Sequence, residues 1–207
     1  GDEVVTGFGR TGNWFGCQTI GMKPDMIAMA KGLSSSYFPI SAVLVGRPIL
    51  DALARMDAKG ELFGHGFTNS GHPVGCAIAL EAIRIYEEMD VVAHVRQMGA
   101  RLRNGLEGVA AQSGIVGQVR GAGLMLGVEL VADPASRTAF DPALKVGARF
   151  DAEALRNGLI IRAMGDTIGF CPPLIIDDAG VDEAIDLFAR TLRTIEASVQ
   201  GQRRAAE

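Results

Sequence analysis

Short apolar runs separated by turn residues alternate with longer amphipathic stretches along this chain. A run of about four to eight apolar residues bounded by glycine, serine or proline predicts a buried strand. Such runs occupy residues 26–30, 40–45, 114–121, 124–130, 159–162 and 167–171. The pattern therefore predicts two strands early in the chain and a second group of strands in its later half.

Longer stretches with apolar residues every three or four positions predict helices between these strands. The predicted helices cover residues 47–56, 73–112 and 142–157, and a last one begins at Asp177 or Asp178. Asp90 marks a kink or a break within the second of them. Strands alternating with helices, followed by a small sheet flanked by helices, predict an α/β part and then an α+β part.

Composition excludes several classes of protein. Of the 207 residues, 48% are hydrophobic and 21% are charged, which is typical of a globular protein. A formal net charge of −4 argues against a nucleic-acid partner. No apolar run approaches the roughly 20 residues that span a bilayer. The three cysteines are widely spaced and odd in number, which predicts a reducing, cytoplasmic location and no metal site.

A glycine pattern near the beginning invites comparison with dinucleotide-binding proteins. Gly7, Gly9 and Gly12 fit G-x-G-x-x-G, and Asp25 follows at a suitable distance. A dinucleotide site needs a helix that begins at these glycines, because its N-terminus binds the pyrophosphate. Gly16, Gly21 and Pro24 interrupt the stretch that follows and leave no room for such a helix. The pattern therefore disfavours NAD binding.

Lys31 ends the first apolar run and precedes the Gly/Ser turn of residues 32–36. Burial at a strand end disfavours an ammonium group and lowers the pKa of the lysine. A neutral lysine amine is a nucleophile that forms Schiff bases with carbonyl compounds. The alternative is that Lys31 caps a strand at the surface, and the residues alone leave both interpretations open.

Residues 60–71 form a predicted loop with four glycines, several hydroxyl groups and little that packs. Backbone N–H groups and hydroxyls in such a loop can bind an anion. A plain connector of the same composition is the alternative.

Several segments, in their order along the chain, resemble the class III aminotransferases, which are pyridoxal-phosphate (PLP) enzymes of fold type I. They are Asp2-Glu3-Val4, Thr6-Gly7-Phe8-Gly9-Arg10-Thr11-Gly12, Lys23-Pro24-Asp25, Ala30-Lys31-Gly32-Leu33, His65-Gly66-Phe67-Thr68, Ser70-Gly71-His72-Pro73, Arg162, Gly165-Asp166 and Pro172-Pro173-Leu174. The resemblance covers nearly the whole chain and corresponds to the C-terminal half of such an enzyme. It implies the last part of a large PLP-binding domain in residues 1–92 and a small α+β domain in residues 93–207.

The resemblance implies roles for individual residues. Asp2 would pair with the pyridine nitrogen of PLP, and Val4 would pack on one face of the ring. Lys31 would bind PLP covalently and then move a proton as general base and acid. Phe67 and Thr68 would reach the phosphate of the neighbouring subunit's PLP, which implies a homodimer with shared active sites.

Arg162 resembles the arginine that binds the substrate carboxylate with its two-pronged guanidinium group. The alternative for Arg162 is an exposed arginine at a strand end. Ser36 stands where the family often has glycine, and Asn69 replaces a frequent tyrosine. The Gly/Ser phosphate-binding loop and the ring-stacking aromatic of the family lie upstream of the matched segments, so this chain alone is not expected to hold PLP in the usual way.

The implied function is transfer of an amino group from an ω-amino acid or amine to pyruvate or a similar 2-oxo acid. A PLP-dependent decarboxylase or aminomutase of the same fold shares Asp2 and Lys31, so these two residues do not discriminate between the reactions. A non-catalytic fragment or interaction module is the third hypothesis.

Overall fold

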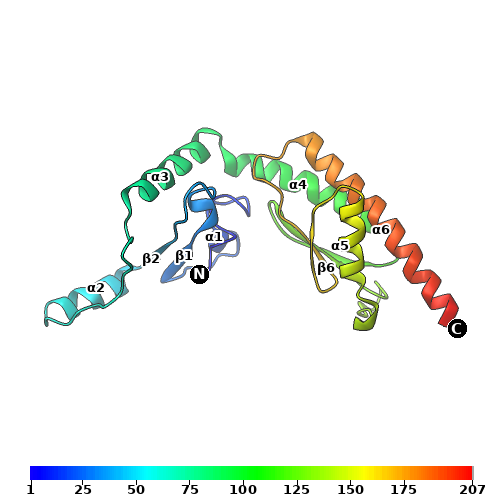
Figure 1. Cartoon of the computed structure of the whole chain (residues 1–207), viewed down its shortest axis with the longest axis horizontal. Coiled ribbons are helices and arrows are strands. Elements are labelled where there is room, and N and C mark those ends of the chain that lie inside the picture. The colour runs from blue at the N-terminus through cyan, green and yellow to red at the C-terminus, as the bar shows by residue number, and fades with distance from the viewer. Residues whose placement is uncertain (207) are drawn as a thin grey trace. The chain divides into compact units, whose positions relative to one another are not determined.

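The computed structural model describes residues 1–206, with side chains described through Gly201. The chain divides into two compact units, the first Gly1–Ala93 and the second beginning at His94. In Figure 1 the chain is coloured from blue at its N-terminus to red at its C-terminus, and several of its elements carry their labels. No helix in the described part of the chain has the length and hydrophobicity to cross a membrane.

The first unit combines a small sheet with helices. Its elements are α1 (Gly16–Thr19), β1 (Met26–Met29), a 3-10 turn η1 (Lys31–Leu33), β2 (Ala42–Val45), α2 (Arg47–Asp57) and α3 (Pro73–Glu88). β1 pairs with β2 in antiparallel register, Met26 opposite Val45 and Met29 opposite Ala42. On its other side β1 makes a parallel bridge, in which Asp2 lies opposite Ala28. The residues around Asp2 therefore extend the sheet beside β1.

The second unit is built around a four-stranded antiparallel sheet in the order β3-β4-β6-β5. Its elements are α4 (Val91–Ala110, which begins in the first unit), β3 (Val116–Ala122), β4 (Met125–Leu130), η2 (Pro142–Leu144), α5 (Val146–Arg156), β5 (Arg162–Met164), β6 (Thr167–Phe170) and α6 (Asp178–Ala206). Leu126, Val128 and Leu130 of β4 are buried and alternate with more exposed residues, as expected for a sheet covered on one face.

Aromatic side chains from three elements form the centre of this unit's core. The Phe188 ring of α6 lies 5.2 Å from the Phe150 ring of α5 and 5.3 Å from the Phe170 ring of β6, measured between ring centroids. Phe150 and Phe188 are fully buried. Both helices therefore pack on the covered face of the sheet, and the predicted apolar stripe of the last helix faces the core.

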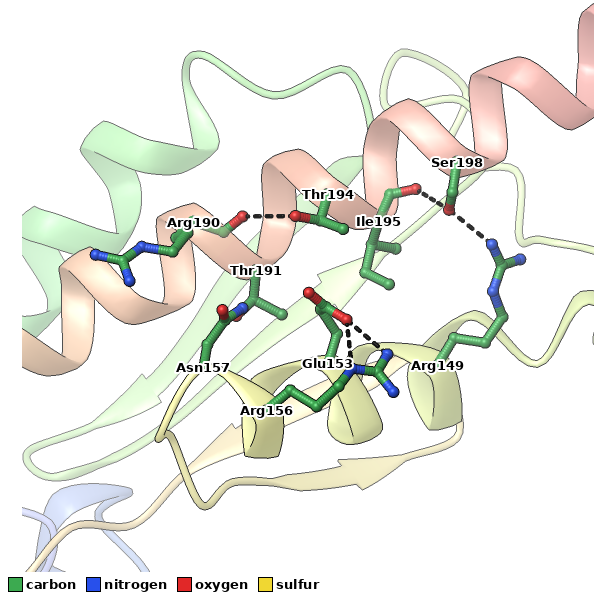
Figure 2. Close-up of polar contacts among 9 residues, drawn as sticks. All are labelled: Arg149, Glu153, Arg156, Asn157, Arg190, Thr191, Thr194, Ile195 and Ser198. Carbon is green, nitrogen blue, oxygen red and sulfur yellow. Dashed lines mark hydrogen bonds and ion pairs between the residues drawn. The ribbon is translucent and has the colours of Figure 1, made fainter.

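A line of polar contacts accompanies the apolar contacts between α5 and α6 (Figure 2). Arg149 donates from Nη2 to Oγ of Ser198 at 2.6 Å, and Asn157 donates from Nδ2 to Oγ1 of Thr191 at 3.1 Å. Thr191 is fully buried, and its hydroxyl donates to the carbonyl oxygen of Leu187. Because the buried hydroxyl is satisfied in both directions, it adds specificity to the helix pairing without leaving an unpaired polar group.

One predicted strand differs from the structure, and the predicted break at Asp90 is confirmed. The predicted strand at 159–162 is wrong, because β5 begins only at Arg162, opposite Gly169 of β6. In the same register Ile161 and Ile160 would lie opposite Phe170 and Cys171, at and past the end of β6, and Leu159 would lie opposite Pro172, which has no N–H group to donate. The helical stretch predicted at 73–112 is divided at Asp90, as predicted, into α3 and α4, and Asp90 has a left-handed φ of 45°.

The second unit allows a test of close packing by glycine substitution. A Cβ on Gly147 of α5 would overlap the carbonyl oxygen of Gly165, in the turn between β5 and β6. We expect Gly147→Ala to lower the free energy of unfolding by about 1–3 kcal/mol, measured by urea denaturation, because either α5 or the turn must shift.

Gly108→Ala is the matched control, because Gly108 is exposed on α4 and a Cβ there would meet no atom within 4 Å. Alanine is the better helix former, so this variant should be more stable by roughly 0.5–1 kcal/mol. Equal stability of the two variants would contradict the close approach of α5 to the β5–β6 turn.

Candidate active site

An amine and a carboxylate lie at one edge of the first unit's sheet. The N–H of Ala28 donates to the carbonyl oxygen of Gly1 at 2.9 Å, and the N–H of Glu3 donates to the carbonyl oxygen of Ala28 at 2.8 Å. These bonds set Asp2 beside β1, parallel to it, and Lys31 follows β1 after one intervening residue. Parallel neighbours end at the same edge of a sheet, which is where ligands bind in α/β folds.

The turn that carries Lys31 has an unusual backbone. Lys31, Ser35 and Ser36 have positive φ angles of 43°, 50° and 67°, in the left-handed region that favours glycine. The angle at Ser36 gives a physical reason why glycine suits this position. Such conformations cost about 1–3 kcal/mol each, and the surrounding structure must compensate for them.

The predicted burial of Lys31 is wrong, because its side chain is exposed. The chain leaves β1 at Ala30 and turns at once into η1, which places Lys31 outside the sheet rather than within its apolar layer. The buried positions of this segment are Met29 before the lysine and Leu33 and Ser34 after it.

One carboxylate oxygen of Asp2 is hydrogen-bonded to the backbone two residues further along the chain. Its Oδ1 accepts a hydrogen bond from the N–H of Val4 at 3.0 Å, and the carboxylate is exposed. Val4 is half-buried beside it. The local turn therefore orients the Asp2 carboxylate at the sheet edge and leaves it accessible to a ligand.

Glu3 is buried, with 2% of its surface exposed, and connects the strand end to the glycine-rich loop. Its carboxylate accepts hydrogen bonds from the N–H groups of Gly16 at 2.7 Å and Cys17 at 2.6 Å, and also from the hydroxyl of Thr6. The loop of residues 4–15 is thereby closed against the strand that carries Asp2. The N–H groups at the start of α1 are occupied by this carboxylate, and Gly7–Gly12 forms turns, in agreement with the argument against a dinucleotide site.

These contacts determine the protonation of two side chains. Burial alone would raise the pKa of Glu3, but the hydrogen bonds from Thr6, Cys17 and Gly16 together hold the pKa below its ordinary value of 4.5. Burial, and then the neighbouring Glu3 carboxylate, raise the pKa of the Cys17 thiol. Glu3 is therefore ionised at neutral pH, and Cys17 is a protonated structural thiol rather than a nucleophile.

Phe67 and Thr68 lie in the exposed segment between α2 and α3. Phe67 is 78% exposed, and its N–H donates to Oγ of Ser70 at 2.9 Å. The His65 ring lies edge-on to the Phe67 ring, 5.7 Å away. The contacts of Phe67 are thus within its own loop, and the loop offers backbone and hydroxyl groups to the outside rather than to Lys31.

Arg162 begins β5 in the second unit, and its side chain is exposed. Its β5–β6 hairpin is supported from α5, where the N–H of Gly147 donates to Oδ1 of Asp166 at 2.8 Å. The exposed position suits both hypotheses for Arg162, a carboxylate-binding arginine and a surface arginine at a strand end.

Sequence reasoning missed two residues that hold this site together, Glu3 and Tyr86. Glu3 was visible only as a second charged residue beside Asp2 at the strand end, and a charged residue requires polar partners when it is buried. The Tyr86 hydroxyl donates to the carbonyl oxygen of Gly32, next to Lys31, and in the sequence Tyr86 was visible only as a hydroxyl-bearing residue within a predicted helix. The N–H groups of Gly16 and Cys17 that bind Glu3, and the carbonyl group of Gly32 that binds Tyr86, come from other segments of the chain. Residue spacing alone therefore did not identify either contact.

Comparison with known proteins gives a consistent result. Residues 1–192 match the sequence profile of the family described as Aminotransferase class-III. The chain is 42% identical over 198 residues to the probable gamma-aminobutyrate transaminase 3, mitochondrial, of Oryza sativa subsp. indica. It is 45% identical over 196 residues to the uncharacterized aminotransferase y4uB of Sinorhizobium fredii. Its fold is similar to that of the omega transaminase from Pseudomonas jessenii solved in complex with PMP, with a TM-score of 0.90 and 45% identity.

These relatives are considerably longer than this chain. The matches cover 96% and 94% of the chain but 39% and 42% of the two curated relatives, and 96% of the chain but 44% of the solved structure. The chain thus spans about two fifths of their length. The similarities confirm the predicted family resemblance and the predicted fold class, part of a fold type I large domain followed by an α+β domain.

The buried Glu3 carboxylate predicts a pH-dependent contribution to stability. Because the pKa of Glu3 is lowered in the folded state, its contribution is fully present above the unfolded value near 4.5 and is lost as the pH falls through the folded value. We expect Glu3→Gln to lower the free energy of unfolding by about 1.5–3 kcal/mol at pH 7 and by progressively less below pH ~4.5.

Urea denaturation across a pH series measures this difference. Glu87→Gln is the control, since Glu87 lies exposed on α3, and its effect should remain within about 0.5 kcal/mol throughout. A Glu3→Gln difference that stays constant down to pH ~3 would contradict the role assigned to the ionised carboxylate.

Proposed function

Because the chain belongs to the class III aminotransferase family, we propose that it supplies Asp2 and Lys31 to the active site of a PLP-dependent aminotransferase. The enzyme would transfer an amino group from an ω-amino acid or amine to pyruvate or a similar 2-oxo acid. The supporting observation is the shared sheet edge, where the Asp2 bridge to β1 places a carboxylate beside the strand that leads to Lys31.

The residues at this edge suit PLP by their chemistry. A primary amine is the group that bonds covalently to an aldehyde, and a carboxylate stabilises a protonated ring nitrogen. Lys31 and Asp2 supply these two groups, and the half-buried Val4, two residues after Asp2, offers an apolar surface. When bound, PLP supplies an electron sink that stabilises negative charge on the substrate carbon.

The chain's own residues would then position groups and transfer protons. The Asp2 carboxylate, oriented by the N–H of Val4, would accept a charge-assisted hydrogen bond from the protonated ring nitrogen of PLP. The free Lys31 amine would act as general base and accept a proton from the substrate carbon. It would then act as general acid and donate that proton to the cofactor. Its position outside the sheet leaves room for that amine to move.

The exposed loop would complete a neighbouring site. In this proposal Phe67 and Thr68 offer an N–H and a hydroxyl to the phosphate of PLP in a second subunit, so the enzyme is a homodimer with shared active sites. The exposure of the loop residues and the internal contacts of Phe67 with Ser70 and His65 support an outward role. The first unit would be the end of the large domain and the second the small domain. A cytoplasmic location stays a prediction.

Arg162 would bind the carboxylate of the substrate. Its guanidinium is exposed at the start of β5, on a hairpin that α5 supports through Gly147 and Asp166. A carboxylate-bearing acceptor such as pyruvate suits this residue, which favours transamination over decarboxylation of the same cofactor complex. An assay that measures both pyruvate consumption and carbon dioxide release distinguishes transamination from decarboxylation.

Lys31→Ala tests the covalent role. We expect the holoenzyme variant to lack the absorbance band of lysine-bound PLP and to lose at least about 10³-fold in kcat, since both the covalent bond and the proton carrier are removed. Spectroscopy and a pyruvate-coupled assay measure the two effects. Lys59→Ala, a change at an exposed lysine after α2, is the control. Persistence of the band in Lys31→Ala would disprove the proposal.

Arg162→Leu tests substrate recognition. Loss of a charge-assisted, two-pronged contact should lower kcat/KM for pyruvate by about 10- to 100-fold. The kcat/KM for an amine donor without a carboxylate should change by less than about threefold. Arg190→Leu, at an exposed arginine of α6, is the control. Equal losses with both substrates, or none, would favour the surface-arginine alternative.

A further inference from the structure

A side chain from a distant helix holds the turn that carries Lys31. Tyr86 lies on the inner side of α3, with 9% of its surface exposed, and its hydroxyl donates to the carbonyl oxygen of Gly32 at 2.7 Å. The two residues are 54 positions apart in sequence. Gly32 directly follows Lys31, so this bond restrains the peptide next to the lysine.

The same glycine also packs against Phe8. A Cβ on Gly32 would lie 2.9 Å from Cβ of Phe8, closer than two such carbons approach in real proteins. Phe8 is 3% exposed, and its ring lies 6.5 Å from the Tyr86 ring and 5.6 Å from the Phe15 ring. Gly32 therefore contacts the side chain of Phe8 and accepts a hydrogen bond from the Tyr86 hydroxyl, and a side chain at this position would force Phe8 to shift.

The loop that carries Phe8 is itself held in place by hydrogen bonds. The loop that carries Phe8 is closed by the buried Glu3 carboxylate through Gly16 and Cys17. Glu3 also belongs to the segment that pairs with β1 and carries Asp2. A continuous set of contacts thus connects the residue after Lys31 with the residue after Asp2.

Lys31 needs such a support because its own backbone is strained. Its φ of 43° lies in the left-handed region, and the turn's internal bonds are those from Leu33 N–H to Ala30 O at 2.9 Å and from Ser34 N–H to Lys31 O at 3.2 Å. An exposed lysine in this conformation would relax toward more populated angles if the next peptide were free. Among the described residues, the Tyr86 hydroxyl supplies the side-chain hydrogen bond to the carbonyl oxygen of Gly32.

We propose that Tyr86 is a positioning residue for Lys31, acting through the carbonyl group of Gly32 and against the ring of Phe8. This inference rests on the proposed function, because it concerns the geometry of the same lysine. Tyr86 touches neither substrate nor reacting atoms in this assignment. Its hydroxyl keeps the strained turn in the conformation from which the amine meets the cofactor.

Tyr86→Phe removes only the hydroxyl and keeps the ring that packs on Phe8. In the apoenzyme, loss of one hydrogen bond should accelerate backbone amide exchange of residues 31–34 by about fivefold, with exchange in β1 unchanged. The rate of covalent reattachment of PLP, followed by absorbance, should fall by a similar factor. In the holoenzyme kcat should fall severalfold while KM for the amine stays within about twofold.

Tyr37→Phe is the matched control, since the chain has two tyrosines and the side chain of Tyr37 is 83% exposed. It makes the same chemical change within the loop that follows Lys31 and should leave amide exchange and PLP reattachment unchanged. A general loss of stability in Tyr86→Phe would accelerate exchange throughout the first unit, including β1, and would overturn the positioning role.

The outcomes also separate this inference from the proposed function. If wild-type enzyme forms no covalent bond between Lys31 and PLP, the proposed function fails. If wild-type enzyme forms the bond, and Tyr86→Phe matches it in amide exchange, reattachment rate and kcat, the function stands and the positioning role of Tyr86 fails.

Discussion

Two backbone hydrogen bonds determine where the chemical groups of the first unit lie. Ala28 donates to Gly1 and accepts from Glu3, so the segment around Asp2 runs parallel to β1. Asp2 therefore lies opposite Ala28, and Lys31 follows Ala28 by three residues in the direction in which both segments run. With this pairing shifted by one residue, the side chain of Asp2 would point to the opposite face of the sheet.

The buried charge of Glu3 keeps that pairing in place. A carboxylate with 2% exposure is tolerable only because three donors surround it, two of them N–H groups at the start of α1. The glycine-rich loop and the strand end consequently behave as one packed piece. Phe8, which belongs to this loop, packs against Gly32. The turn that carries Lys31 and the segment that carries Asp2 are therefore both in contact with the same loop.

The second unit combines a well-packed core with an exposed arginine. The rings of Phe150, Phe170 and Phe188 bind α5, α6 and the sheet together, and the contact of Gly147 with Asp166 continues that packing to the β5–β6 turn. Arg162 projects from this hairpin into solvent. A supported backbone with an exposed guanidinium suits recognition of a carboxylate that comes from outside the unit, because only the side chain must adjust.

Hydrophobic periodicity and local motifs were sufficient for the order of the elements and for the family resemblance. The stripe of the last helix and the strands at 26–30 and 167–171 could be predicted because side-chain spacing alone encodes which face is buried. The start of β5 at Arg162 could not, because the limits of a strand depend on where its partner strand ends, and β6 ends at Phe170.

At the site, the sequence by itself determined which chemical groups are present, above all Asp2, Lys31 and Arg162. Only the tertiary structure decided that Asp2 lies beside β1, that Lys31 is exposed rather than buried, and that Tyr86 reaches Gly32 from a distant helix. The physical reason is that pairing, burial and long-range hydrogen bonds depend on which segments meet in space, whereas residue type and spacing describe one segment at a time.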